Sequence, residues 1–140
     1  MRQLVREGKR SPLIRAKALE LVAHLPQKHW MGQIRALHAF VRDHIRYVKD
    51  INGIETVHTP ETLLSVGQGD CDDKATLLAA LLESIGHPTR FWAVGFKPGV
   101  FSHVLVETQV GPKWLPLETT EPVAPGWRPR NIVSQIHRHN

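Results

Sequence analysis

The stretch GQGDCDDKATLLAALLESI, residues 67–85, decides the fold because it joins a glycine-bearing loop to the most strongly patterned helix of the chain. Apolar side chains recur there at helical spacing in a broad stripe, which predicts a buried helix over residues 71–85. The stripe consists of Ala75, Leu78, Ala79, Leu82 and Ile85. Asp70 is placed to cap this helix, and Gly86 with Pro88 is placed to end it. Cys71 is therefore expected at the first position of a buried helix.

Cys71, the only cysteine of the 140 residues, lies where a helix best favours a nucleophilic thiolate. A helix N-terminus and a nearby imidazolium lower the pKa of a thiol, and the free N–H groups there can bind an oxyanion. A lone cysteine is otherwise more often a buried structural residue. Four polar neighbours argue against an apolar burial site here: Gln68, Asp70, Asp72 and Asp73. We interpret Cys71 as a candidate nucleophile whose own N–H is a candidate oxyanion donor.

Three strand-like segments follow the predicted helix, at residues 90–96, 101–108 and 113–118. Pro116 removes one backbone donor from the last segment, which favours an edge position in a sheet.

Before the cysteine, Ser11-Pro12 starts a helix to about residue 25, and a second helix is expected over 31–48. Asn52-Gly53 marks a turn, and Thr59-Pro60 begins a short helical turn through about residue 65. Helices followed by an antiparallel sheet, with one helix packed on it, indicate an α+β fold.

Among the nine histidines, His103 stands out because the next strand of its predicted hairpin carries a carboxylate. A four-residue turn over 109–112 would pair Thr108 with Lys113, and the same register would place His103 directly opposite Glu118. A slip of one residue would point the two side chains to opposite faces. A cysteine nucleophile needs a base and a group that orients the base, and this pair would supply both. The simpler alternative is a cross-strand ion pair on the surface.

Three segments of the chain resemble the core of the transglutaminase-like superfamily. They are TPETLLSVGQGDCDDKATLLAALLESIGHPTRF (59–91), FSHVLVE (101–107) and KWLPLETT (113–120). The family pattern is a glycine-rich approach to a Cys that opens a helix, a His on a following strand and an acidic residue on the next. The resemblance covers about residues 45–121 and implies a papain-like α+β core with a triad of Cys71, His103 and Glu118. The family usually has Asp in place of Glu118, so the triad must adjust its geometry or lose activity.

The resemblance implies amide-bond chemistry through a thioester on Cys71, most simply a peptidase or amidase acting on a protein or peptide. One alternative is transglutaminase-type acyl transfer to an amine. Another is a non-catalytic structural or assembly protein of a phage particle, which the basic termini and Glu118 in place of Asp suggest. The short length and the GDCDD sequence most resemble small phage and prophage members of the family. Phage or prophage proteins would then be partners. Tyr47 and Gln68 are candidates for a second oxyanion donor. Three tryptophans either line the substrate cleft or belong to the core: Trp92, Trp114 and Trp127.

The carboxylates that flank the cysteine, Asp70 and Asp72, resemble those of calcium-dependent bacterial members of the family. Two or three carboxylates can form a site for a hard cation such as calcium. Helix capping explains the same residues without a metal. No other cofactor is expected.

The net charge of +5 is concentrated at the two ends of a chain that we expect to form a single domain over residues 1–140. Residues 1–10 are interpreted as a basic arm and 122–140 as a Pro-rich basic tail, both most simply solvated. The arm has no interleaved aromatic residues to stack bases, which argues against nucleic-acid binding. No apolar stretch is long enough for a bilayer, no signal-peptide pattern is present, and one cysteine cannot form an internal disulfide. A cytoplasmic protein of a bacterial or phage-infected cell, or a virion-associated one, is expected.

Overall fold

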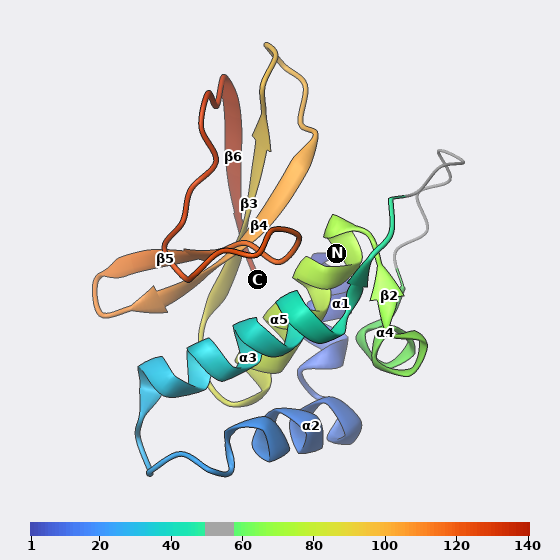
Figure 1. The fold of residues 1–140 in the computed structure, drawn as a ribbon, viewed down its shortest axis with the longest axis vertical. Helices are drawn as coiled ribbons and strands as arrows, with labels where there is room; N and C mark the ends of the chain where they lie inside the picture. Colours follow the sequence, from blue (N-terminus) through green and yellow to red (C-terminus); the bar gives the residue numbers. More distant parts are fainter. Residues whose placement is uncertain (50–57) are drawn as a thin grey trace.

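The computed structural model describes residues 1–49 and 58–140, so the turn expected at Asn52-Gly53 lies outside the described residues. The described helices are α1 (Arg2–Gly8), α2 (Pro12–Val22), α3 (Trp30–His44), α4 (Pro60–Val66) and α5 (Cys71–Ser84). The described strands are β1 (Arg46–Tyr47), β2 (Gln68–Gly69), β3 (Thr89–Gly95), β4 (His103–Val110), β5 (Lys113–Leu117) and β6 (Ser134–His139). Figure 1 shows the helices gathered beside a long, twisted antiparallel sheet. The predicted α+β class is confirmed.

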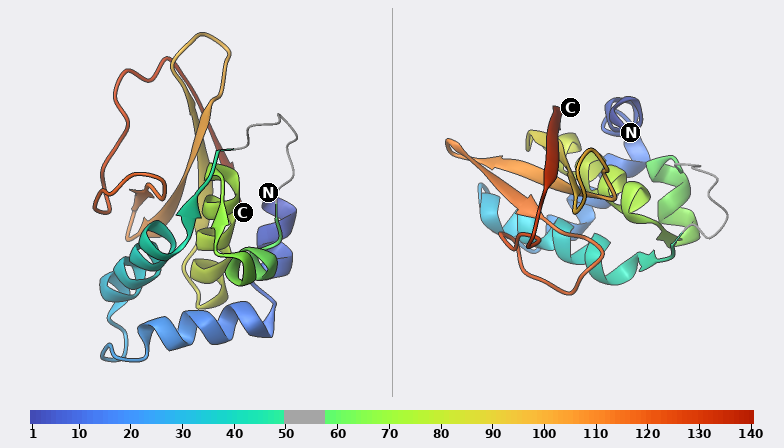
Figure 2. Two further views of the ribbon diagram at one scale, coloured as in Figure 1. Left: turned by 45° about the vertical axis from the view of Figure 1, so that its right-hand side comes forward. Right: turned by 90° about the horizontal axis from the view of Figure 1, so that it is seen from above.

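Helix α5 is the central helix, enclosed between the sheet and the other helices (Figure 2). Every residue from Asp73 to Leu82 is buried. Asp70 accepts a hydrogen bond of 2.9 Å from the backbone N–H of Asp73, and Asp73 accepts one of 3.1 Å from that of Asp70. This reciprocal capping box satisfies two backbone donors that the first turn of a helix leaves free. The predicted helix and its cap are confirmed, and they hold the start of α5 in one orientation.

The main sheet has the strand order β5-β4-β3-β6, with every neighbouring pair antiparallel. Its inner face contributes apolar side chains to the core that it shares with the helices: Phe91, Val104, Val106 and Leu117. The opposite face carries a smaller buried cluster of Trp92, Val94 and Leu105, against which Ile132 packs. β5 lies at one edge of the sheet, as Pro116 predicts.

The N-terminal residues do not form the expected solvated arm. They form α1, which packs beside α5 and α4 through the fully buried Val5. A Cβ atom on Gly8 would lie only 2.9 Å from Pro60 and 3.1 Å from Ala80, so a glycine at this position lets α1 approach closely. The helix has only one fully buried apolar side chain among exposed basic ones, and such a short helix has no readable period.

The C-terminal residues are not the featureless extended tail that the composition suggests. β6 pairs with β3 and forms the second edge of the main sheet. Its alternation of polar residues gives little strand signal, because an edge strand is stabilised here by backbone pairing more than by buried side chains. Arg2 donates a 2.8 Å hydrogen bond to the backbone carbonyl of His139, which links the two ends of the chain.

The second predicted helix, α3, ends at His44 rather than at residue 48. Ile45 already has extended dihedral angles, and β1 then pairs in parallel with β2. The backbone N–H groups of Arg46 and Val48 donate to the carbonyls of Gly67 and Gly69. The glycine-bearing loop before Cys71 is therefore held by the strand that follows α3.

None of the helices in the described ranges is long and apolar enough to cross a membrane.

Candidate active site

Cys71 is the first residue of α5 and is half-buried, with the capped helix on one side and the paired β2 strand on the other. Its backbone N–H belongs to the first turn of the helix, where no intrahelical acceptor exists. The sulfur lies 3.9 Å from Asp72 Oδ1, a long contact for a thiol donor. The predicted placement of Cys71 at a helix N-terminus is confirmed.

His103 and Glu118 are in direct contact. The Nε2 atom of His103 lies 2.6 Å from Oε2 of Glu118, and the Glu118 side chain is only 1% exposed. His103 opens β4, and Glu118 directly follows the last residue of β5. The extra methylene of Glu118, relative to the usual Asp, therefore does not prevent the carboxylate from reaching the imidazole.

The predicted hairpin register was wrong by two residues. Val110, rather than Thr108, pairs with Lys113 across a two-residue turn, so Glu118 lies diagonally from His103 and not directly opposite. A slip of one residue would have reversed the faces, whereas a slip of two preserves them. The two side chains consequently still meet, and the long glutamate side chain spans the diagonal.

The charges of this cluster favour an imidazolium. Burial opposes the charged ring, but hydrogen bonds and negative charge from Cys71 and Glu118 outweigh it and raise the pKa of His103 to about 10. Burial likewise opposes ionisation of Glu118, but its contacts with His103 and Thr120 lower the pKa of the carboxyl below its ordinary value. At neutral pH the site therefore holds an imidazolium–carboxylate pair, with the sulfur of Cys71 beside the same ring.

Two residues that the sequence did not single out hold Glu118 in place. Thr120 donates from its backbone N–H and from its hydroxyl to Oε1 of Glu118, each at 2.9 Å. His38 of α3 is fully buried, and its Nε2 contacts the backbone carbonyl of Glu118 at 2.6 Å. A signal for His38 existed, because it lies four residues after Ile34 on the apolar face of its helix. A polar residue at such a position needs a buried partner.

Residues 15–119 match the family profile of the transglutaminase-like superfamily, which is three quarters of the chain. The chain belongs to this superfamily. No significant match was found among curated protein sequences. The expected papain-like, transglutaminase-like core is thus confirmed at the level of the family and the fold.

Three solved structures illustrate the shared transglutaminase-like fold. A candidate protease from Parabacteroides distasonis has 17% identity and a TM-score of 0.67, and the alignment covers 84% of this chain and 25% of that one. A candidate cysteine protease from Cytophaga hutchinsonii has 17% identity and a TM-score of 0.63, covering 91% and 46%. LapG of Legionella pneumophila has 18% identity and a TM-score of 0.62, covering 88% and 74%. The chain therefore spans a quarter and just under half of the first two proteins.

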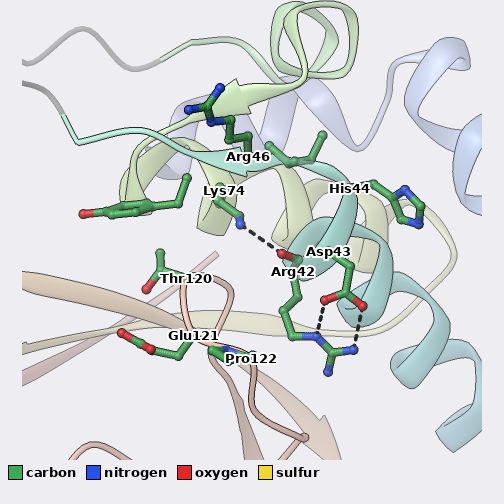
Figure 3. A pocket seen from close by; sticks show the side chains of 10 residues that line it. Arg42, Asp43, His44, Arg46, Lys74, Thr120, Glu121 and Pro122 are labelled. Atoms are coloured by element: carbon green, nitrogen blue, oxygen red, sulfur yellow. Dashed lines mark hydrogen bonds and ion pairs between the residues drawn. The ribbon is translucent and has the colours of Figure 1, made fainter.

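A pocket of about 360 Å³ is drawn in Figure 3, and two of its lining residues adjoin the candidate triad of Cys71, His103 and Glu118. It lies between the end of α3 with β1 on one side and the segment after β5 on the other. Thr120, which holds Glu118, and Lys74, one helical turn after Cys71, both line it. Tyr47 also lines the pocket. It lies near enough to Cys71 that, after burial, the negative charge of Cys71 contributes to raising its pKa. This pocket is the candidate place for substrate.

The three tryptophans considered for the cleft do not line this pocket. Trp92 is buried on the outer face of the sheet, where it donates to Gln135. Trp114 contacts the guanidinium of Arg90, and Trp127 is partly exposed. Trp92 is therefore a core residue, the more common role of a large aromatic on a strand.

The calcium site that resemblance to calcium-dependent members suggested, with Asp70 and Asp72 as candidate ligands, stays a prediction. A calcium-bound form of LapG has been solved. Here the carboxylates of Asp70 and Asp73 are occupied by the capping box, and Asp73 also accepts from the backbone N–H of His58 at 2.7 Å. Residues 1–49 and 58–140 contain no group of three acidic, His or Cys residues placed to hold a metal. Helix capping accounts for Asp70.

Proposed function

We propose that this protein is a cysteine peptidase or amidase in which Cys71 is the nucleophile, His103 the base and Glu118 the orienting acid. The observation that supports this role most directly is the 2.6 Å contact between His103 Nε2 and Glu118 Oε2, with Cys71 beside the same ring. An imidazolium beside a sulfur stabilises a thiolate, which is the reactive form of cysteine. Solved structures of the same fold are named as cysteine or candidate proteases, which agrees with this class of chemistry.

In the first half of the reaction the Cys71 thiolate attacks the carbonyl carbon of the scissile amide and forms a carbon–sulfur bond. The carbonyl π electrons move to the oxygen, which becomes an oxyanion. When the intermediate collapses, the carbon–nitrogen bond breaks, and the His103 imidazolium donates its proton to the departing amine. A thioester on Cys71 and a neutral His103 remain.

In the second half a water molecule attacks the thioester carbonyl while neutral His103 accepts one of its protons. The carbon–sulfur bond then breaks, the acid product leaves, and the thiolate–imidazolium pair is restored. Glu118 stays ionised throughout, because its role is to orient the imidazole and stabilise the charged ring. Thr120 and His38 assist by keeping Glu118 in position.

Oxyanion stabilisation is assigned to the backbone N–H of Cys71 and the phenol of Tyr47. Burial, followed by the negative charges of Cys71 and Asp70, raises the pKa of Tyr47, so its hydroxyl keeps the proton that it must donate. Gln68 remains the second candidate donor and has an exposed side chain.

Alkylation of Cys71 by iodoacetamide at about pH 6 tests the nucleophile independently of any substrate. The folded protein should react faster than the same chain unfolded in urea, and the His103→Gln variant should lose this advantage. Equal rates for folded and unfolded wild-type protein would remove the main support for the triad. A fluorescent primary amine added with a glutamine-bearing protein then separates hydrolysis from acyl transfer, since only acyl transfer incorporates the amine.

A further inference from the structure

Lys74 is a buried cation that the proposed chemistry does not use. Its side chain is 1% exposed, although it comes from the first turns of α5 and reaches the wall of the pocket beside Cys71. Figure 3 shows its ammonium directed at the backbone carbonyl of Arg42, to which it donates a hydrogen bond of 3.3 Å. An ammonium has three N–H donors, so this single long bond satisfies it incompletely.

No carboxylate among the described residues lies within ion-pair distance of the Lys74 ammonium, and the two whose charges act on it, Asp43 and Glu118, have other partners. Asp43 is bound by Arg42 through two contacts of 2.7 and 2.8 Å. Glu118 is bound by His103 and Thr120. Fully buried lysines are rare unless they are paired. Burial lowers the pKa of Lys74 to about 8, against the opposing charges of Asp43 and Glu118, so the group is still mostly charged at neutral pH.

Helix α5 places this charge, which has no ion-pair partner among the described residues, about one turn from the candidate nucleophile. Lys74 follows Cys71 by three residues, so the two lie on neighbouring positions of one helix face. Arg46 of β1 also lines the pocket, but Figure 3 shows its guanidinium directed away from the Lys74 ammonium. A volume of about 360 Å³ can hold a side chain with part of its backbone.

We propose that this pocket is a substrate subsite beside the scissile bond and that Lys74 binds the carboxylate of an acidic residue in the peptide. The proposal rests on the peptidase function described above and specifies its substrate class. A carboxylate at Lys74 would supply, through a charge-assisted hydrogen bond, the counter-charge that no residue within 1–49 and 58–140 supplies at ion-pair distance. The long hydrogen bond from Lys74 to the Arg42 carbonyl would either remain or be replaced by the bond to the bound carboxylate.

The competing explanation is structural, because Arg42 lies in the last turn of α3 and a cation stabilises the carbonyls at a helix C-terminus. A purely structural Lys74 would affect stability and would treat acidic and neutral substrates alike. An acid-binding Lys74 would discriminate between them. Ligands that differ only in carrying an acidic or a neutral side chain therefore distinguish the two roles.

Peptide alkylating agents that react with Cys71 provide that comparison without requiring turnover. One series carries an iodoacetyl group at the N-terminus and the other a chloromethyl ketone at the C-terminus, each made with Glu or Gln at the first or second residue. At one position the Glu reagent should inactivate wild-type protein with a KI about tenfold lower than the Gln reagent, at the same limiting rate. Lys74→Met should remove the difference, so that the Glu and Gln reagents inactivate the variant with the same KI. Lys97→Met removes the same charge from an exposed turn and should retain the preference.

Equal KI values for every Glu and Gln pair in wild-type protein would overturn the proposal, and so would a preference that survives in Lys74→Met. If Lys74→Met does not fold, Lys74→Gln replaces it in the same comparison of KI values. The comparison of the Glu and Gln reagents on wild-type protein does not depend on either variant. Failure of the peptidase function has a different signature. In that case the reagents label Cys71 no faster than an unfolded thiol and no peptide is hydrolysed, whatever the Glu preference.

Discussion

The Nε2 atom of His38 lies 2.6 Å from the backbone carbonyl oxygen of Glu118, and this contact joins α3 to the acid of the candidate triad. A carbonyl only accepts, so Nε2 carries the proton and donates. Nδ1 is buried and has no partner within residues 1–49 and 58–140. Burial lowers the pKa of His38, although the bond to Glu118 opposes this, and the ring is neutral at neutral pH. His38 is thus a positioning residue for Glu118.

Replacing His38 tests this positioning role. His38→Leu leaves a buried carbonyl without a donor and should cost about 1–3 kcal/mol of unfolding free energy. It should also slow alkylation of Cys71 at about pH 6, because a displaced Glu118 orients His103 less well. His38→Gln keeps an N–H donor near the same point and should recover most of the alkylation rate. Urea unfolding and alkylation kinetics measure the two effects. A His38→Leu protein with unchanged alkylation would leave His38 with a packing role only.

His103 should titrate far above the ordinary histidine value of 6.5, with a midpoint near 10 in wild-type protein. Glu118→Gln and Cys71→Ala each remove a hydrogen bond and a negative charge that favour the imidazolium, so each should lower the midpoint. Without both partners, only burial remains, and the midpoint should fall below 6.5. NMR of ring-labelled histidine follows this titration directly. A wild-type midpoint near 6.5 would show that the ring is not paired in solution.

Glu118 should make stability depend on pH in acid. Its folded pKa is lowered, so its contribution is present above the unfolded value of 4.5 and is lost as the pH falls through the folded pKa. In that window the unfolded chain binds the extra proton, so the unfolding free energy should drop by up to about 1.4 kcal/mol per pH unit from this group. Glu118→Gln should flatten the acid slope measured by urea unfolding. An identical slope in the variant would assign the acid sensitivity to other groups.

Asp70 should act as a helix cap and not as a calcium ligand. Asp70→Ala removes the acceptor for the Asp73 N–H and should cost about 0.5–2 kcal/mol, whereas Asp70→Asn should retain most of the cap. Neither millimolar calcium nor a chelator should shift the thermal unfolding midpoint of the wild-type protein. A calcium-dependent rise of the midpoint that disappears in Asp70→Asn would instead establish a metal site there.

Features with a local signal were predicted correctly from the sequence. The helix that starts at Cys71 follows from a capping residue and an apolar period, and the edge position of β5 follows from Pro116. The register of the β4–β5 hairpin was wrong because glycine and proline allow several turn lengths around Gly111-Pro112. The predicted contact between His103 and Glu118 still forms because the register differs by two residues, and a shift of two keeps side chains on the same face of a strand.

By itself the sequence determined the α+β class, the helix that presents Cys71 and the identity of the residues in the candidate triad. Only the tertiary structure decided that α1 packs on α5, that β6 completes the sheet, and that His38 and Lys74 adjoin the site. His38 and Glu118 are 80 residues apart, and no local period or turn signal connects them. Capping and periodicity act within one element, whereas the partner of a buried polar group depends on which elements pack together. Which elements pack together depends on the contacts of the whole core, and no single segment specifies them.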